Sequence, residues 1–168
     1  MALTTNVSLE VIARLTGAGD LGNASAPLDY SKLIAMGDGT GLNQADVLWH
    51  DQRTLGSGAN EDLDLAGSLT DLLGNAITVV DLKLVLFHVP TAGAGPITVS
   101  RPASNGVPLF GAASDSVKVM GGGAFLWVNP DATDVVTVTA GTGDLINVLN
   151  DDGAASVTYD VIIAGTSA

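Results

Sequence analysis

The stretch that decides the fold class is Ile77-Thr-Val-Val-Asp-Leu-Lys-Leu-Val-Leu-Phe-His-Val89. Apolar residues fill it, and two charged side chains, Asp81 and Lys83, stand two positions apart in its centre. Successive side chains of a β-strand point to opposite faces, so this spacing places both charges on one face. It places Leu82, Leu84 and Leu86 on the other. We therefore expect one long, central and mostly buried strand over residues 77–89.

Alternation of polar and apolar residues continues on both sides of this stretch and predicts roughly ten to twelve strands in all. The other strands are expected near residues 7–12, 28–34, 47–52, 97–100, 107–110, 116–120, 124–128, 135–139, 145–149 and 157–164. Glycine-rich clusters lie between them, and glycine suits the tight turns that join strands. One short helix is expected at most, at 68–74, with Ser68 as its N-cap and Gly74 as its end.

The order of these elements favours one antiparallel domain. Parallel βαβ units need regular crossover helices, and the chain has no such series. A chain of 168 residues fits one ordinary domain, and the absence of cysteine means that its core forms without disulfides. The sequence therefore predicts a single all-β domain over residues 1–168. We expect an antiparallel β-sandwich or a jelly-roll-like barrel with at most one short helix.

The balance of charges limits the kinds of partner. Six basic residues stand against 18 acidic ones, which gives a net charge of −12. Phosphate recognition needs clustered lysine and arginine, so we expect no nucleic acid and no anionic membrane as a partner. Charged residues make up only 14% of the chain, against about 25% in a typical domain. Neutral or apolar surface should therefore meet another protein.

Two patterns resemble catalytic or cofactor sites, and each has a simpler explanation. Gly17-Ala-Gly-Asp-Leu-Gly22 matches the dinucleotide-binding fingerprint, but that site needs a helix after it to hold the pyrophosphate. An alternating, strand-like segment follows it here.

His50 and His88 are the only histidines, and no Gly-x-Ser-x-Gly nucleophile motif accompanies them. Both histidines are expected to be ordinary strand residues.

Carboxylates gather at Glu61, Asp62 and Asp64, with Asp71 nearby. A calcium ion needs six or more oxygen ligands, and no segment matches a twelve-residue calcium loop, although an irregular site stays open as an alternative. Paired carboxylates also serve glycosidases, but aromatic residues, which line sugar clefts, make up only 4% of the chain. The sequence thus predicts no catalytic residue, no cofactor and no metal site, and therefore a protein that is not an enzyme.

The two tryptophans admit two interpretations. Trp49 and Trp127 each lie in an apolar strand beside a polar segment, where a large ring is either a core residue or an interface anchor. We favour the core interpretation for both. The residues that we name for a possible subunit interface are Trp49, His50, Arg53, Phe110 and Trp127.

The first ten residues lack the basic start and apolar centre of a signal peptide, so a soluble protein is expected.

Several strings resemble small virion proteins of tailed bacteriophages. They are Arg101-Pro-Ala-Ser-Asn-Gly-Val-Pro-Leu-Phe110, Gly121-Gly-Gly-Ala-Phe-Leu-Trp-Val128, Thr139-Ala-Gly-Thr-Gly-Asp-Leu145 and Ser156-Val-Thr-Tyr-Asp-Val-Ile-Ile-Ala-Gly165. Leu42-Asn-Gln-Ala-Asp46, Arg53-Thr-Leu55 and Glu61-Asp-Leu-Asp-Leu-Ala-Gly67 fit the same pattern, so the resemblance covers most of the chain. It implies a non-enzymatic structural protein of the phage particle.

Among such proteins, the resemblance favours a head decoration (cement) protein, which binds the outer capsid surface and stabilises the head lattice. It implies the major capsid protein as a partner and a homotrimer as the oligomeric state. The location would be the capsid surface of the virion, after assembly in the host cytoplasm, and the interface residues named above would contact the capsid or a neighbouring subunit. The alternatives are a tail, baseplate or head-fibre component, or a glycan-binding module that recognises the host.

Overall fold

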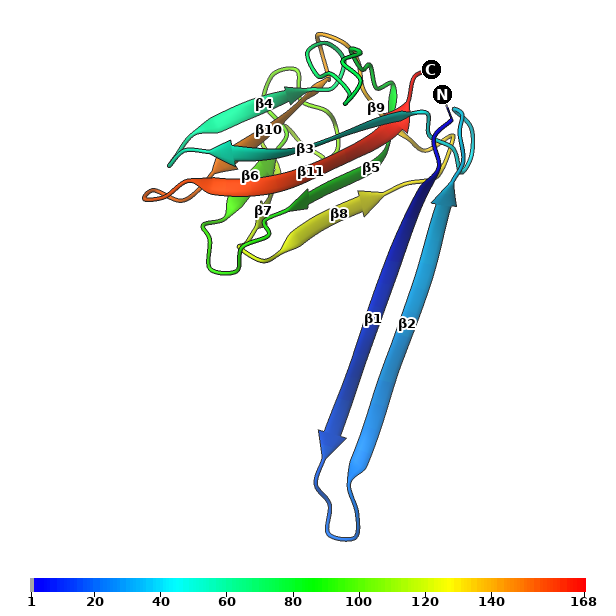
Figure 1. The fold of residues 1–168 in the computed structure, drawn as a ribbon, viewed down its shortest axis with the longest axis vertical. Helices are drawn as coiled ribbons and strands as arrows, with labels where there is room; N and C mark the ends of the chain where they lie inside the picture. The colour runs from blue at the N-terminus through cyan, green and yellow to red at the C-terminus, as the bar shows by residue number, and fades with distance from the viewer. Residues whose placement is uncertain (1) are drawn as a thin grey trace.

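The computed structural model describes residues 2–168, which form strands, turns and loops without any helix in that range. Figure 1 shows packed sheets and one long hairpin that extends away from them. The strands are β1 (Thr5–Gly17), β2 (Ala24–Met36), β3 (Val47–Leu55), β4 (Asn60–Asp64), β5 (Asp81–His88), β6 (Ile97–Ser100), β7 (Ser116–Val119), β8 (Ala124–Val128), β9 (Val136–Thr137), β10 (Leu145–Asn150) and β11 (Val157–Thr166). Among the described residues, no helix is long and apolar enough to cross a membrane.

Two antiparallel sheets pack face to face and form the body of the molecule. One sheet has the strand order β4-β10-β6-β7, and the other has the order β3-β11-β5-β8, with β9 paired to one end of β5. Inward side chains of both sheets fill the space between them, among them Leu63, Val99 and Val148 from the four-stranded sheet and Phe87 and Tyr159 from the five-stranded one. Burial of this apolar layer is the main stabilising contribution. The predicted antiparallel β-sandwich is confirmed, and the sheets do not close into the alternative barrel.

The short helix predicted at 68–74 is wrong, because a turn occupies its place. The Asp71 carboxylate accepts hydrogen bonds from the backbone N–H groups of Leu73 and Asn75, at 2.9 and 2.8 Å. Such bonds from the backbone to a local side chain compete with the helical pattern and favour a turn. Gly74 has a φ of 82°, a left-handed conformation that glycine adopts without strain, and it closes the turn.

The strand predicted at 107–110 is also wrong. The N–H of Leu109 donates to the carbonyl of Val107 at 2.8 Å, which closes a tight turn. Pro108, between them, has no N–H with which to pair with a neighbouring strand. Val107 is nevertheless buried in the core between the sheets. Val107, whose apolar side chain suggested a strand, therefore belongs to a loop and packs in the core.

The central strand β5 is shorter than predicted and contains a β-bulge. Ala164 and Gly165 are consecutive residues of β11, but they pair with Leu84 and Leu82, so that Lys83 is left unpaired. An extra residue in one strand changes which face the following side chains occupy. Leu82 therefore lies in the core between the sheets, whereas Leu84 lies in a second cluster on the outer side. The prediction that these two leucines share a face is wrong for this reason.

The bulge depends on close packing around Gly165. A Cβ atom at this position would lie 2.5 Å from the carbonyl oxygen of Asp81 and 2.6 Å from Cγ1 of Val79, so only glycine fits. Lys83, the extra residue of the bulge, is fully buried, and its amine donates to the backbone carbonyl of Asp131. A buried amine needs such a partner, because desolvation without a hydrogen bond is costly.

The strands β1 and β2 form a separate two-stranded hairpin. Thirteen residue pairs run in unbroken antiparallel register from Thr5 opposite Met36 to Gly17 opposite Ala24. At about 3.3 Å per residue, the hairpin is about 40 Å long. It joins the body only at its base (Figure 1). The nucleotide-like motif 17–22 forms the tip between these two strands, so no helix follows it and the required phosphate site is absent from this segment.

Candidate assembly surface

The β1–β2 hairpin has one apolar and one polar face. The register pairs each odd-numbered residue of β1 with an even-numbered residue of β2, and paired residues share a face. We call one of these sets the apolar hairpin face: Val7, Leu9, Val11, Ala13, Leu15, Ala26, Leu28, Tyr30, Lys32, Ile34 and Met36. Lys32 is its only charged residue. The opposite face carries Glu10, Arg14 and Asp29 and is mostly polar.

The base of the apolar hairpin face is buried against the body. Val7 and Met36 form the second core cluster together with Ala45, Leu84 and Ala164, and Ile34 packs against it. This cluster lies on the outer side of the five-stranded sheet, where Leu84 and Ala164 pair with each other. Apolar burial therefore anchors the hairpin and fixes which of its faces continues outward from the body.

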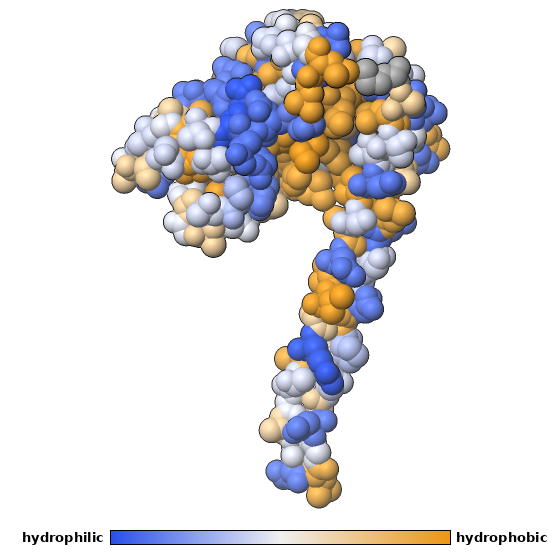
Figure 2. Space-filling view, in the orientation of Figure 1, coloured by the Kyte–Doolittle hydropathy of each residue, from blue (hydrophilic) through white to orange (hydrophobic). Residues whose placement is uncertain are grey.

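Beyond the base, the same face lies in solvent. Val11, Leu28 and Tyr30 are each 52% exposed, and Leu15 is 77% exposed. Figure 2 shows that the outer part of the hairpin is covered by nothing else in the chain. A two-stranded hairpin is marginally stable in water, because neither of its faces packs against a second layer. A hairpin of this length with an uncovered apolar face therefore needs a second surface to cover it.

The outer face of the five-stranded sheet is also apolar near the hairpin base. Its register places side chains in rows across the strands β3, β11, β5 and β8. The first row is Leu48, Ala164, Leu84 and Val128, and the second row is His50, Ile162, Leu86 and Leu126. A third row, Gln52, Asp160, His88 and Ala124, is mostly polar. We call the apolar residues of the first two rows the apolar sheet face.

Figure 2 shows this apolar surface beside the hairpin, with a hydrophilic band farther away. The turn at 71–74 stands next to it and exposes Leu72 and Leu73. Both leucines line a groove together with Leu48 and His50, and Leu72 also borders the polar third row. The β3 side of the sheet face therefore borders a shallow groove that is apolar near Leu48 and polar at the third row, a shape that suits an elongated partner.

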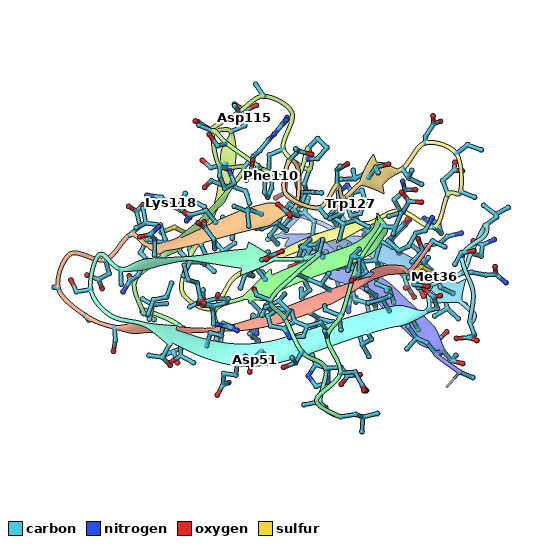
Figure 3. All side chains as sticks on the ribbon, turned by 90° about the horizontal axis from the view of Figure 1, so that it is seen from above. Met36, Asp51, Phe110, Asp115, Lys118 and Trp127 are labelled. Carbon is cyan, nitrogen blue, oxygen red and sulfur yellow. The ribbon has the colours of Figure 1, made fainter. Side chains whose placement is uncertain are left out.

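His50 is the one predicted interface residue that lies on this sheet face, where it is exposed. Trp49 points the other way and is buried in the core between the sheets, which confirms its core interpretation. Phe110 and Trp127 lie away from Asp51 and the edge strand β3 (Figure 3). They are half-buried and pack against the same core. The structure does not bring the five predicted residues together, and an interface at Phe110 or Trp127 stays a prediction.

Arg53, the last predicted interface residue, belongs to a polar cluster that joins the two sheets. Its Nη1 donates to Oε2 of Glu61 at 2.6 Å, and the hydroxyl of Tyr159 donates to Oε1 of the same carboxylate at 2.8 Å. The guanidinium also lies 5.5 Å from the ring centroid of Trp49, a cation–π distance. Burial, and then the bond to Glu61, raise the pKa of Tyr159 well above its ordinary value. Arg53 thus stabilises its own subunit.

The other candidate chemical residues do not assemble into a reaction centre in the described part of the chain. Nδ1 of His88 lies 3.2 Å from Oδ2 of Asp160 on the polar third row, while His50 stands one row away. Asp62 binds the Asn147 side chain at 2.7 Å, and Glu61 binds Arg53 and Tyr159. Across residues 2–168, no three His, Cys, Asp or Glu side chains converge on one point as metal ligands would.

Asp71, which shapes the turn beside the groove, is expected to titrate below the ordinary range of an aspartate. The side chain of Asn75, and then backbone N–H groups, hold its pKa below 3.8. Because the folded-state pKa is lowered, the stability that these bonds contribute is present above the unfolded-state pKa and is lost as the pH falls through the folded-state value. A carbon-13 NMR titration should give a midpoint under 3.8, and Asn75→Ala should raise it. A wild-type midpoint at or above 3.8 would contradict the assignment.

Comparisons of the chain with protein-family models, with curated proteins and with solved structures found no match. The two apolar faces are therefore the features of this molecule that point to a function. Sequence reasoning missed both. The alternation in 5–17 and 24–36 revealed the strands, but no local pattern indicates that a strand pair leaves the body. Leu72 and Leu73 fall within 68–74, where a short helix is expected from the sequence, so the expected helix gave no sign of their exposure on a turn.

Proposed function

We propose that this protein is a non-enzymatic structural component of a phage virion, a decoration (cement) protein that binds the outer capsid surface and stabilises the head lattice. The observation that carries the proposal is the hairpin of 13 residue pairs that holds an apolar face away from the body. A free protein gains nothing from such a face. A subunit of a lattice uses it to reach a neighbour and to bury apolar area there.

The architecture supports this function in two further ways. The body is a β-sandwich with two packed sheets and a closed apolar core, which is a rigid module. The net charge of −12, with only six scattered basic residues, keeps the protein from binding packaged or free DNA through phosphates. A rigid, acidic module with a projecting apolar arm is suited to protein partners in a crowded particle.

The partners follow from this proposal. The major capsid protein would supply the surface on which the protein sits, and the protein would assemble as a homotrimer at the capsid surface of the virion. Many copies on a regular lattice gain avidity, so that a modest contact per copy is sufficient for stable attachment. The assembly would take place in the host cytoplasm, where the capsid forms.

Quantitative mass spectrometry of purified virions tests the proposal. The protein should be present in a copy number comparable to that of the major capsid protein. Virions that lack it should lose DNA at lower temperature or lower salt than complete ones, because the lattice is no longer stabilised. A copy number of only a few per particle would contradict the decoration role. Immunogold label at the tail or at one vertex would then indicate a tail, baseplate or head-fibre component.

A further inference from the structure

We propose that the apolar hairpin face of one subunit docks on the apolar sheet face of a second copy of this chain, so that subunits associate by exchanging hairpins. The inference rests on the proposed structural function and names the partner that covers the hairpin. Both surfaces belong to the same chain. The outer hairpin has no covering layer in the isolated subunit. The hairpin base covers Leu84 and Ala164 of the sheet face but leaves Leu48 exposed and Ile162 and Leu86 half-buried.

A subunit cannot cover its own hairpin. Val7 and Met36 fix the hairpin base on the body, and the register continues without a break to Gly17 and Ala24 at the tip. The hairpin therefore extends as one piece away from the sheet (Figure 1). Folding Val11 or Leu28 back onto the same sheet would require breaking the anchored base or the continuous ladder. The surface that covers the outer hairpin must come from another molecule.

The contact at the hairpin base shows that these two faces fit each other. Within one subunit, Val7, Ile34 and Met36 of the apolar hairpin face already pack on Leu84 and Ala164 of the sheet. The proposed contact continues this interface with the same kinds of side chain on both sides. The outer hairpin offers further aliphatic side chains and one tyrosine, and the second row of the sheet offers further aliphatic side chains beside that cluster.

The charges of the two faces are also complementary. Lys32 is the one charged residue of the apolar hairpin face. The apolar rows of the sheet end at Asp160, which is half-exposed and lies beside Gln52 and His88. A lysine can lie along an apolar surface and extend its amine to a carboxylate at the rim. The charges of the opposite hairpin face, such as Glu10 and Arg14, stay in solvent when the apolar face docks.

The area available suits a stable contact. The nine residue pairs beyond the buried base cover about 30 Å by 10 Å on one hairpin face. If two subunits exchange hairpins reciprocally, about 1,200 Å² of surface is removed from water, which reaches the range of specific interfaces. A closed ring of three subunits, as in the homotrimer proposed above, removes more. One docked hairpin removes about 600 Å² and falls below this range, so a stable contact needs reciprocal exchange or a closed ring.

The hairpin offers a matched pair of variants for a test. Val11→Asp with Leu28→Asp places two carboxylates on the apolar hairpin face. Ile12→Asp with Leu33→Asp places them on the opposite face, where the original side chains are even more exposed, at 71% and 59%. Sedimentation velocity should show an oligomer for wild type, self-association about 100-fold weaker for the first variant, and little change for the second. Equal effects of both variants, or a monomeric wild type, would overturn the proposal.

The sheet side is tested by Leu48→Asp with Leu86→Asp, checked for folding by circular dichroism and thermal melting. This variant should also self-associate about 100-fold more weakly than wild type. When it is mixed with the Val11→Asp, Leu28→Asp variant, each pair of molecules retains one intact hairpin and one intact sheet face, so a mixed complex should appear. If the sheet variant remains fully oligomeric, the hairpins contact each other or another surface, and the proposed docking is wrong.

A crosslinking measurement does not depend on any destabilising change. The photoreactive residue p-benzoylphenylalanine replaces Tyr30 in one chain, and this chain is mixed with isotopically labelled wild-type protein. After irradiation, crosslinks should join position 30 to β3, β5 or β11 of the labelled partner. Crosslinks only to β1 and β2 of the partner, or only within one chain, would refute the docking.

These results separate the inference from the proposed function. A wild-type monomer that nevertheless binds capsids through its hairpin would overturn hairpin exchange and leave the decoration role standing. In that case, the apolar hairpin face covers capsid protein instead of a second copy. A hairpin-exchanged oligomer that is absent from the capsid surface would support the inference and remove the decoration role.

Discussion

Asn150→Ala should lower the free energy of unfolding by about 3 kcal/mol, the largest effect that we expect from a single polar residue in the body. Asn150 ends β10 and is completely buried. Its Nδ2 donates to the carbonyls of Gly56 and Ala155, both at 2.8 Å, and of Leu55 at 3.1 Å. Its Oδ1 accepts the N–H of Asp152 at 2.9 Å. One amide thus ties two turns to the end of a core strand.

The cost is large because alanine removes the side-chain partner of the Leu55 and Ala155 carbonyls and of the Asp152 N–H, although the Gly56 carbonyl keeps the N–H of Ala59. A buried carbonyl that loses its donor retains its desolvation cost with no compensating bond. Urea unfolding followed by fluorescence measures the change. Asn147→Ala is the matched control, since Asn147 lies on the same strand but is only half-buried and binds Asp62 near the surface. We expect well under 1 kcal/mol for it, and equal costs for the two variants would contradict the role of Asn150.

Glu61→Ala should lower the free energy of unfolding by about 2 to 3 kcal/mol. The carboxylate accepts from Arg53 and from the hydroxyl of the fully buried Tyr159, and it connects β4 of one sheet to β3 and β11 of the other. Its loss leaves a phenolic hydroxyl without an acceptor inside the sandwich. It also removes the closer of the two carboxylate partners of Arg53, whose side chain is about two-thirds buried, and leaves Asp51 at 3.3 Å. Chemical unfolding at neutral pH measures the change.

Two companion variants test the origin of this effect. Glu61→Gln keeps an oxygen that accepts the Tyr159 hydroxyl and should recover part of the loss. Asp62→Ala removes a neighbouring, exposed carboxylate of the same strand and should change stability little. If Asp62→Ala were as costly as Glu61→Ala, net charge would explain the result and the specific cluster would not.

The same cluster predicts how stability depends on alkali. Burial raises the pKa of Tyr159 above its ordinary value, and Glu61 raises it further. A raised folded-state pKa contributes stability that is fully present below the unfolded-state pKa of about 10 and declines as the pH rises above it. Wild-type stability should therefore fall above about pH 10, and Glu61→Ala should show a weaker dependence in that range.

The local pattern of the sequence determined much of the fold. Period-two alternation identified most of the strands, and turn-forming glycines separated them. The absence of regular crossover helices indicated antiparallel pairing, and the structure has an antiparallel sandwich. These features are local, because the alternation of side chains and the conformational freedom of glycine depend on a few neighbouring residues. For the same reason, the alternating segment after the motif 17–22 predicted a strand there and not a helix, and β2 follows the motif.

Periodicity failed where other contacts, one set distant and one set local, override the structure that it indicates. Lys83 interrupts the register of β5 because Gly165 of a strand far along the chain fits closely against Val79 and Asp81. The turn at 71–74 forms because Asp71 binds backbone N–H groups that a helix would have used otherwise. Neither outcome follows from the periodicity of the stretch in which it occurs.

By itself, the sequence determined an acidic, all-β chain with most of its strands at the positions where apolar residues alternate, and it favoured a core position for Trp49. Only the tertiary structure decided that β1 and β2 leave the body and that their apolar face continues beyond the sheet on which its base is packed. The alternating sequence pattern of a strand is the same whether its apolar side packs in its own core or against another subunit. The difference is fixed by which surfaces already fill the core, and in this chain the sandwich is complete without the outer hairpin.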